Sequence, residues 1–322
     1  MFPGVHPPRS HLRRRTALRG ALAAAALAIG APLAARAQQR AEPRAPAPPP
    51  PAPPVQPRSV ARSGHFVTSD KVRLHYLEAG QGRTILFVPG WSMPAFIWEP
   101  QLAGLSPRWR TVAMDPRSQG RSQVARSGHE PSRRGRDIGE AIERLGADRV
   151  VLVGWSLGVL DSLAFVQEHG DARIAGLVLV DNSVGEGTPP APSRPSTFLP
   201  SLRAEREKTM ASFVKAMYAT PQDPAYLEAV TRAALATPYD AQAKLLSYQR
   251  PREYWRDALY ATRRPVLYAI RPRFAAQGDA VKARHADAGV EVFADAGHAL
   301  FVDRAERFNA LLEAFCSGRA QW

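Results

Sequence analysis

Cysteine is nearly absent from this chain. Cys316 is the single one in 322 residues, so an internal disulfide is excluded. It lies at the end of a C-terminal helical pattern, which favours a buried, apolar role. The most apolar stretch, residues 20–34, is shorter than the 18 or so residues expected of a membrane-spanning helix. No group of His, Cys and carboxylate residues has the spacing of metal ligands, so the sequence implies no metal and no cofactor.

Acidic residues are outnumbered, with 29 Asp and Glu against 43 Lys and Arg and a formal charge of +14. Six of the basic residues lie within residues 1–37, and without them 37 basic residues against 29 acidic ones leave +8. The remaining arginines are scattered, and no basic helical pattern with interleaved aromatic residues is present. We therefore expect a solvated, arginine-rich surface and no nucleic-acid partner.

Residues 1–37 have the layout of an export signal. Arginines without acids come first, a short apolar run follows, and Ala35-Arg36-Ala37 offers a cleavage site of small residues. Arg14-Arg15 resembles the twin-arginine signal of bacteria, and ordinary secretion is the alternative. The sequence thus predicts a periplasmic or secreted bacterial protein with no stable membrane span after signal cleavage. Residues 38–62 are rich in Ala and Pro, which predicts a stiff, extended tether.

From residue 63 to residue 322, short apolar runs alternate with helical patterns. This alternation predicts an α/β domain with a mostly parallel, eight-stranded sheet and flanking helices. The predicted strands are 64–69, 72–78, 84–89, 110–115, 149–154, 175–181, 265–270 and 290–294, and the clearest predicted helices are 134–145, 157–169, 276–287 and 303–315.

Residues 184–263, between the sixth and seventh strands, contain no convincing strand pattern. We expect them to form a helical lid, entered through the prolines of residues 189–195. The large apolar residues of this segment either form the lid's own core or line an apolar pocket. They are Phe213, Met217, Tyr218, Tyr226, Leu245, Leu246, Tyr248, Tyr254 and Trp255.

Ser156 occupies the pattern Gly154-Trp155-Ser156-Leu157-Gly158, between the apolar run 149–153 and a helical pattern. A G-x-S-x-G sequence between a strand and a helix is typical of a nucleophile elbow. The two glycines let the turn close, and the free N–H groups of the helix start favour an oxyanion. The alternative is a serine that only caps the helix.

Residues 63–322 resemble an α/β-hydrolase of the lidded esterase and haloperoxidase-like branch. Beside the elbow, the resemblance rests on Val88-Pro89-Gly90-Trp91 after the third strand, the segment Asp115 to Ser122 after the fourth, and Ala296-Gly297-His298 after the eighth. It implies the α/β-hydrolase fold, in which the segment beginning at Asp115 turns the chain below the site as a scaffold. It does not support an epoxide hydrolase or a dehalogenase, whose nucleophile in this fold is an aspartate where Ser156 stands.

The resemblance implies a catalytic role for Ser156 and His298. A neutral serine is a poor nucleophile, so it needs a base within hydrogen-bond reach. His298 lies at the carboxyl edge of the predicted sheet, where open α/β sheets bind ligands. Gly90 would let the chain bend so that the N–H of Trp91 points into the site, and with the N–H of Leu157 it would form an oxyanion hole.

The acid of the expected triad has more than one candidate. The family's commonest pattern places it shortly after the seventh strand, where this chain has Arg271-Pro272-Arg273-Phe274. Asp181, at the end of the sixth strand, is favoured because some α/β-hydrolases draw the acid from that place. It would orient His298 and stabilise its imidazolium. The alternatives are Asp279, no acid at all, and a purely structural turn role for Asp181.

These residues predict an exported serine hydrolase that cleaves a carboxylic ester by acyl transfer. Its partner would be a small ester-like molecule with an apolar moiety. A thioesterase, a lactonase, a carbon–carbon hydrolase or a cofactor-free perhydrolase would use nearly the same residues. A ligand-binding protein that keeps the fold without catalysis is an alternative from a different class. The sequence leaves the substrate and the oligomeric state open.

Overall fold

The computed structural model describes residues 61–187, 197–247 and 250–322. The predicted export signal, nearly all of the predicted tether, the prolines within 189–195 and Tyr248 lie outside the described residues. Arg62, predicted as the last residue of the tether, belongs to the first strand, where it pairs with Glu78. The folded domain therefore includes residue 62, one residue before the predicted boundary.

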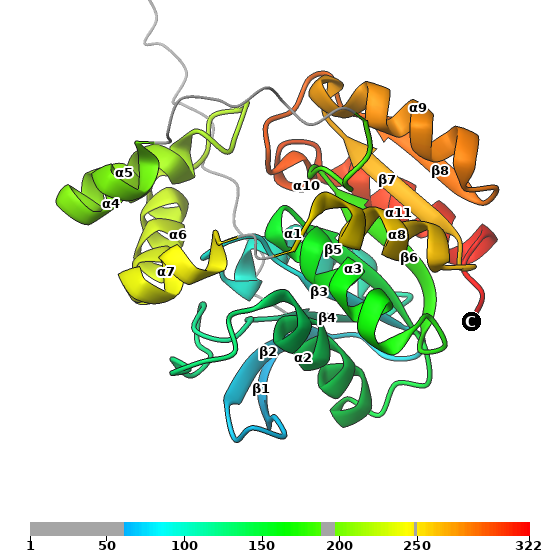
Figure 1. Ribbon diagram of the computed structural model, residues 1–322, viewed down its shortest axis with the longest axis horizontal. Helices are drawn as coiled ribbons and strands as arrows, with labels where there is room; N and C mark the ends of the chain where they lie inside the picture. Colours follow the sequence, from blue (N-terminus) through cyan, green and yellow to red (C-terminus); the bar gives the residue numbers. More distant parts are fainter. Residues whose placement is uncertain (1–60, 188–196, 248–249) are drawn as a thin grey trace, which may run out of the picture. The chain divides into compact units, whose positions relative to one another are not determined.

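Eight strands form a single sheet in the order β1-β2-β4-β3-β5-β6-β7-β8 (Figure 1). β2 pairs antiparallel with β1 and β4, and all other neighbours are parallel. The predicted mostly parallel, eight-stranded sheet is confirmed. The strands are β1 (Arg62–Val67), β2 (Arg73–Ala79), β3 (Thr84–Val88), β4 (Arg110–Met114), β5 (Val150–Trp155), β6 (Ile174–Val180), β7 (Val266–Ile270) and β8 (Ala288–Val292).

The centre of the sheet explains the continuous apolar runs of the sequence. Every residue of β3, β5 and β6 is buried, as expected for parallel strands covered on both faces. Each buried Val, Leu or Ile side chain there contributes about 1.5–3 kcal/mol through removal from water. At the edge, β8 is largely half-exposed and begins two residues before the predicted start at 290.

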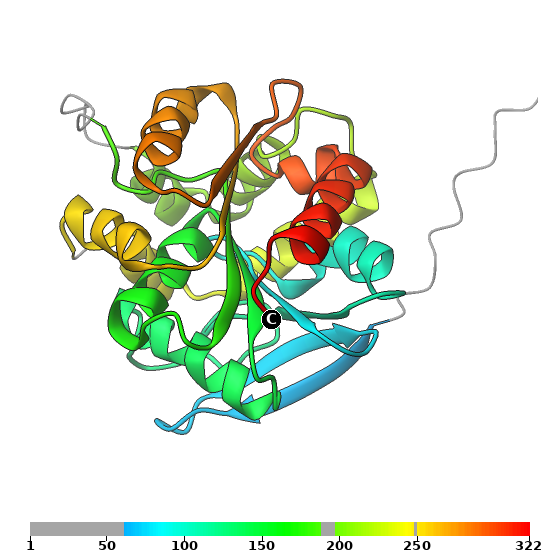
Figure 2. The ribbon, with the colours of Figure 1, turned by 90° about the vertical axis from the view of Figure 1, so that its right-hand side faces the viewer.

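Helices cover both faces of the sheet (Figure 2). α1 packs against α11 on one face, and α3 packs against α2 and α8 on the other, where α9 also lies. α2 begins three residues before the predicted start, with Pro131 at its first position, where a missing N–H costs nothing. The flanking helices are α1 (Glu99–Leu105), α2 (Pro131–Arg144), α3 (Leu157–His169), α8 (Arg252–Ala261), α9 (Ala275–Arg284) and α11 (Ala305–Gly318). Three short helices join them: η1 (Ala95–Trp98), η2 (Pro272–Phe274) and α10 (Leu300–Asp303).

The described residues between β6 and β7 form five helices joined by turns and contain no strand. Four of these helices contact one another and are here called the cap (Figure 1). The fifth, α8, packs against α3 and so belongs to a flanking layer, which narrows the predicted lid of residues 184–263. The cap consists of α4 (Phe198–Ala204), α5 (Arg206–Lys215), α6 (Pro224–Ala236) and α7 (Tyr239–Leu245).

Candidate active site

Ser156 lies in a strained turn between β5 and α3. Its φ of 53° and ψ of −119° fall in a region that non-glycine residues rarely adopt, at a typical cost of about 1–3 kcal/mol. A Cβ on Gly154 would lie 2.3 Å from the carbonyl oxygen of Gly158, and a Cβ on Gly158 would lie 2.3 Å from that of Val88. The N–H of Ser156 donates to the carbonyl of Val180 at 3.0 Å. Glycine at both flanking positions is therefore required for this turn to close.

The structure brings Ser156, His298 and Asp181 into one chain of hydrogen bonds. The Oγ of Ser156 lies 2.9 Å from Nε2 of His298, and Nδ1 of His298 lies 2.7 Å from Oδ2 of Asp181. The side chain of Asp181 is fully buried, whereas that of His298 is 22% exposed. The carbonyl of His298 accepts a hydrogen bond from the indole of Trp155 at 2.8 Å, which ties the histidine loop to the elbow.

Asp181 is surrounded by donors. Besides His298, it accepts hydrogen bonds from the backbone N–H of Arg271 at 3.0 Å and from the Nε of the same residue at 2.6 Å. Burial by itself raises the pKa of Asp181, but the hydrogen bonds and charges of His298 and Arg271 outweigh it, and the pKa is lowered. The carboxylate facing His298 is therefore ionised at neutral pH.

The geometry distinguishes the two acids that the sequence left open. Asp181 contacts His298, whereas Asp279 lies within α9 and makes no hydrogen bond to that ring. Sequence reasoning overlooked Arg271, which it noted only for the acid missing after the seventh strand. Its place directly after β7 was the available signal. It also overlooked Asn182, whose side-chain amide donates to the carbonyl of Ser156 at 2.7 Å.

The loop after β3 approaches Ser156 closely. A Cβ on Gly90 would lie 2.9 Å from the Cβ of Ser156, so a larger residue at this position would push the loop away. Leu157 is the first residue of α3, and its N–H therefore has no carbonyl partner inside the helix. The next amide after Gly90 is that of Trp91, whose part in an oxyanion hole stays a prediction.

The side chain of Trp91 joins this loop to the cap. Its indole N–H donates to the carbonyl of Gln242 on α7 at 2.8 Å. Its ring makes edge contacts with Phe198 of α4 and Phe213 of α5, at centroid distances of 5.4 and 5.3 Å. The residue that would supply one oxyanion donor is thus held by three cap helices.

The histidine loop also contacts the cap, through Asp303 of α10. The carboxylate of Asp303 accepts from the N–H of Gly297 at 2.7 Å and from that of Ala219, after α5, at 2.8 Å. The N–H of Ala299 donates to the carbonyl of Met217 at 2.9 Å. The position of His298 is therefore coupled to the connection between α5 and α6.

A second serine–histidine–aspartate chain joins β1, β2 and the end of β4. The Oγ of Ser63 is 2.9 Å from Nε2 of His75, and Nδ1 of His75 is 2.7 Å from Oδ2 of Asp115. Asp115 also accepts from the backbone N–H groups of Ala95 and Arg121, at 2.5 and 2.9 Å. Asp115 therefore fixes β2, the loop after β4 and η1 to one another, as expected for a scaffold.

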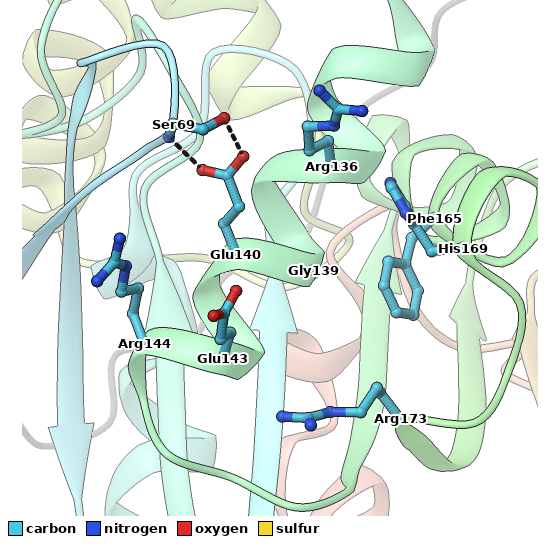
Figure 3. A pocket seen from close by; sticks show the side chains of 9 residues that line it. All are labelled: Ser69, Arg136, Gly139, Glu140, Glu143, Arg144, Phe165, His169 and Arg173. Atoms are coloured by element: carbon cyan, nitrogen blue, oxygen red, sulfur yellow. Dashed lines mark hydrogen bonds between the residues drawn. The ribbon is translucent and has the colours of Figure 1, made fainter.

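A surface pocket of about 600 Å³ lies away from the triad, between α2 and α3 (Figure 3). Its lining includes His169, the last residue of α3, whereas Ser156 lies directly before Leu157, the first residue of that helix. Because 13 helical residues span about 20 Å, the pocket and the triad lie at opposite ends of α3. Within it, Ser69 donates twice to Glu140, at 2.7 and 2.6 Å.

The described residues hold no group of metal ligands and no helix suited to span a membrane. No cluster of three or more His, Cys, Asp or Glu residues in this part of the chain is arranged to hold a metal ion. No helix in the same residues combines the length and the apolarity needed to cross a membrane. The one cysteine, Cys316, is buried and unpaired, as predicted.

Comparison with known proteins identifies the family. A model described as "Alpha/beta hydrolase family" matches residues 85–311, which is more than half of the chain. The chain belongs to the α/β-hydrolase family. A superfamily protein of Bacillus subtilis, YisY, is 24% identical over 267 residues, covering 78% of this chain and 98% of that protein. The predicted family and fold are thus confirmed.

Two further similar proteins bear on activity. A non-heme haloperoxidase of Rhodococcus erythropolis is 37% identical over 117 residues, or 36% of this chain; the match spans 43% of the relative's length. The solved structure of a proposed aryl esterase from Burkholderia cenocepacia has a TM-score of 0.70 at 25% identity, covering 80% of this chain and 98% of that one. Membership of this family, with an esterase-like neighbour, supports a hydrolase with a small-molecule substrate.

Proposed function

We propose that this α/β-hydrolase cleaves carboxylic esters by acyl transfer through a Ser156–His298–Asp181 triad. The proposal rests chiefly on one observation, the unbroken chain of hydrogen bonds from Oγ of Ser156 through both ring nitrogens of His298 to a buried carboxylate. An arrangement of this kind lets an imidazole accept the serine proton while the carboxylate stabilises the charge that forms. The export of the protein by residues 1–37 stays a prediction.

In the first half-reaction, Oγ of Ser156 attacks the ester carbonyl carbon and its proton passes to Nε2 of His298. The carbonyl oxygen becomes an oxyanion, for which the N–H groups of Trp91 and Leu157 are the donors we propose. When the tetrahedral intermediate collapses, the carbon–oxygen bond to the alcohol breaks, and His298 returns the proton to the departing alkoxide. An acyl-serine remains.

In the second half-reaction, water replaces the alcohol. His298 takes a proton from the water as it attacks the acyl carbon, and the oxyanion forms again between the same two donors. The bond to Oγ then breaks, Ser156 recovers its proton from His298, and the carboxylic acid leaves. The buried Asp181 stays ionised throughout and holds the ring in the tautomer that presents Nε2 to the serine.

The surroundings of Trp91 favour a substrate with an apolar moiety. The indole is nearly buried, and the rings of Phe198 and Phe213 from the cap pack against its edge. The transfer of an apolar group from water to such an apolar surface is favourable. We therefore infer a small ester with at least one apolar side, which suits the proposed aryl esterase among the structural relatives.

The test compares the purified mature protein with its Ser156→Ala variant on a panel of short-chain aryl and alkyl esters. A fluorophosphonate probe should label the parent and fail to label the variant, because it reacts with an activated serine hydroxyl. Ser63→Ala is the matched control, since Ser63 is the exposed member of the other serine–histidine–aspartate chain. Turnover that survives Ser156→Ala would refute the proposal.

A second candidate function is cofactor-free perhydrolysis, favoured by the local identity of 37% to a non-heme haloperoxidase. Hydrogen peroxide would replace water in the second half-reaction, so that the acyl-serine yields a peracid instead of an acid. The proton balance at His298 is unchanged. Bromination of an indicator in the presence of acetate, bromide and peroxide would reveal it, and the rate should vanish together with ester hydrolysis in Ser156→Ala.

A further inference from the structure

Arg271 and His298 share one oxygen of the buried acid. Oδ2 of Asp181 lies 2.7 Å from Nδ1 of His298 and 2.6 Å from Nε of Arg271, and Oδ1 accepts the backbone N–H of Arg271 at 3.0 Å. The Asp181 side chain is wholly buried and that of Arg271 is one-quarter exposed. A full positive charge therefore lies beside the carboxylate that would stabilise the imidazolium.

This arrangement has two physical consequences. The backbone and side-chain donors of Arg271 grip both carboxylate oxygens, which restricts the rotation of Asp181 and so orients the ring of His298. The guanidinium also offsets part of the negative potential that the carboxylate exerts on the imidazole. A weaker negative potential stabilises the protonated imidazolium less.

We propose that Arg271 is a positioning residue that fixes Asp181 and weakens the negative potential of this carboxylate at His298. The proposal rests on the triad proposed above and goes beyond it, because Arg271 touches neither the serine nor the attacked carbonyl. It also accounts for a departure in the sequence. The commonest family pattern puts the acid after the seventh strand, whereas here the acid follows β6 and a cation follows β7.

Other titratable groups surround the pair, and the same set is present in any Arg271 variant. Tyr268 of β7 donates its hydroxyl to the carbonyl of Asn182, and burial raises its pKa, so it stays neutral. Asp303 of α10 is held by amides of the histidine loop and of the segment after α5. Asp295 is exposed and paired with Arg304 at 2.6 Å. A difference between parent and variant therefore reports the removed guanidinium.

In the cap, Tyr218 and Tyr226 share a hydrogen bond between their hydroxyls at 3.2 Å. Burial is the main cause that raises the pKa of Tyr226 to about 12, and it raises the pKa of Tyr218 as well. Both phenols are neutral across the range in which a histidine titrates. Neither tyrosine can mimic the effect expected of Arg271.

The experiment compares the parent with Arg271→Met, Arg271→Lys and Arg273→Met in the mature protein. Arg271→Met removes the guanidinium but keeps the backbone N–H that binds Oδ1. Arg271→Lys keeps a positive charge at this position but lacks the planar guanidinium. Arg273→Met makes the same charge change two residues away, at an exposed side chain stacked on Phe274. Thermal melts establish that each variant is folded.

Two readouts are measured against pH: kcat/KM for a short-chain ester, and the NMR titration of the His298 ring, assigned by its absence in His298→Asn. In Arg271→Met we expect the acid limb of kcat/KM and the His298 titration midpoint to move up by about 0.5–1 pH unit. Arg271→Lys should fall between this variant and the parent, and Arg273→Met should match the parent.

The two readouts separate the two proposals. If the parent hydrolyses no ester, the proposed function fails, and the NMR shift in Arg271→Met still supports the role of Arg271. If the parent is active and folded Arg271→Met titrates with the parent within about 0.2 pH unit, the role of Arg271 is refuted while the triad stands. A similar shift in Arg273→Met would also refute it, because the effect would then belong to net charge.

Discussion

Two serine–histidine–aspartate chains in this protein have the same hydrogen-bond lengths. In each, a serine oxygen lies 2.9 Å from Nε2 of a histidine whose Nδ1 lies 2.7 Å from an aspartate oxygen. One is built from residues that follow β5, β6 and β8. The other links β1, β2 and the loop after β4. Hydrogen-bond distance therefore does not decide which serine can attack a substrate.

The main chain around each serine differs. Ser156 has a φ of 53° and precedes the first residue of α3, where free N–H groups and the helix dipole favour an oxyanion. Ser63 lies within β1, in antiparallel register with Leu77 of β2, and among the described residues no helix starts beside it. The comparison teaches that the elbow, which brings amide donors next to the hydroxyl, distinguishes a candidate nucleophile from a serine in a structural hydrogen-bond chain.

The largest expected difference between the two chains is at the serines themselves. Ser156→Ala should lower kcat by about 10⁴- to 10⁶-fold, because the nucleophile is lost. Ser63→Ala should leave kcat within about twofold of the parent, since it removes only the hydrogen bonds of Ser63 with His75 and Arg121, outside the candidate site. Both are measured by ester hydrolysis and by fluorophosphonate labelling. Equal losses of kcat in the two variants would show that the elbow does not distinguish the nucleophile.

Substitution of the aspartate in each chain should affect a different property: activity for Asp181 and stability for Asp115. Asp181→Asn should lower kcat about 10⁴-fold, because an amide favours the wrong tautomer of His298. Asp115→Asn should mainly lower Tm, by about 5–10 °C, because a buried carboxylate with donors on three segments loses its charge. Kinetics and thermal melts on both variants test this. An Asp279→Asn variant serves as the control and should resemble the parent; a loss of activity there would revive the alternative acid.

Features encoded in local pattern could be predicted from the sequence. The continuous apolar runs of β3, β5 and β6 reflect burial on both faces, and these strands were predicted within one residue at each end. The edge strand β8 was shifted, because a half-exposed strand has no run of apolar residues to mark its ends. The short helix α1 was missed, since seven residues hold too few apolar positions to show a period.

In the candidate site, too, residues marked by their local sequence could be predicted, whereas contacts between distant loops could not. Ser156 is marked by its own neighbours, and glycines 154 and 158 have a steric reason that local sequence expresses. The choice of Asp181 over Asp279 depends on how loops 117 residues apart meet, which no local pattern records. The contact between Arg271 and Asp181 divides in the same way: the sequence shows that Arg271 directly follows β7, but not that its guanidinium turns toward the end of β6.

The glycine beside each serine provides a smaller contrast. Gly90→Ala should lower kcat by about 100-fold, because its Cβ would lie 2.9 Å from that of Ser156 and displace the Trp91 amide. Gly64→Ala places a Cβ against the ring of Tyr76, which is half-exposed and can move, so kcat should hold. Steady-state kinetics on folded variants decide this. An unchanged kcat in Gly90→Ala would remove Trp91 from the proposed oxyanion hole.

A third serine–histidine pair shows what a missing acid does. The Oγ of Ser118 lies 2.9 Å from Nε2 of His129, but Nδ1 of this buried ring has no partner among the described residues. Burial, followed by the charges of Lys244, Arg117 and Arg134, lowers the pKa of His129 to about 4. A buried histidine without a carboxylate is therefore held neutral.

The smallest expected effect follows from that lowered pKa. Between about pH 6.5 and pH 4 the unfolded chain protonates this histidine and the folded protein does not, so the free energy of unfolding falls as the pH falls. Over that window the contribution is about 3 kcal/mol, and below pH 4 it is lost completely. His129→Gln has no proton to gain. Its urea unfolding free energy should therefore depend less on pH than that of the parent, and parallel curves would show that His129 is protonated as readily in the folded protein as in the unfolded one.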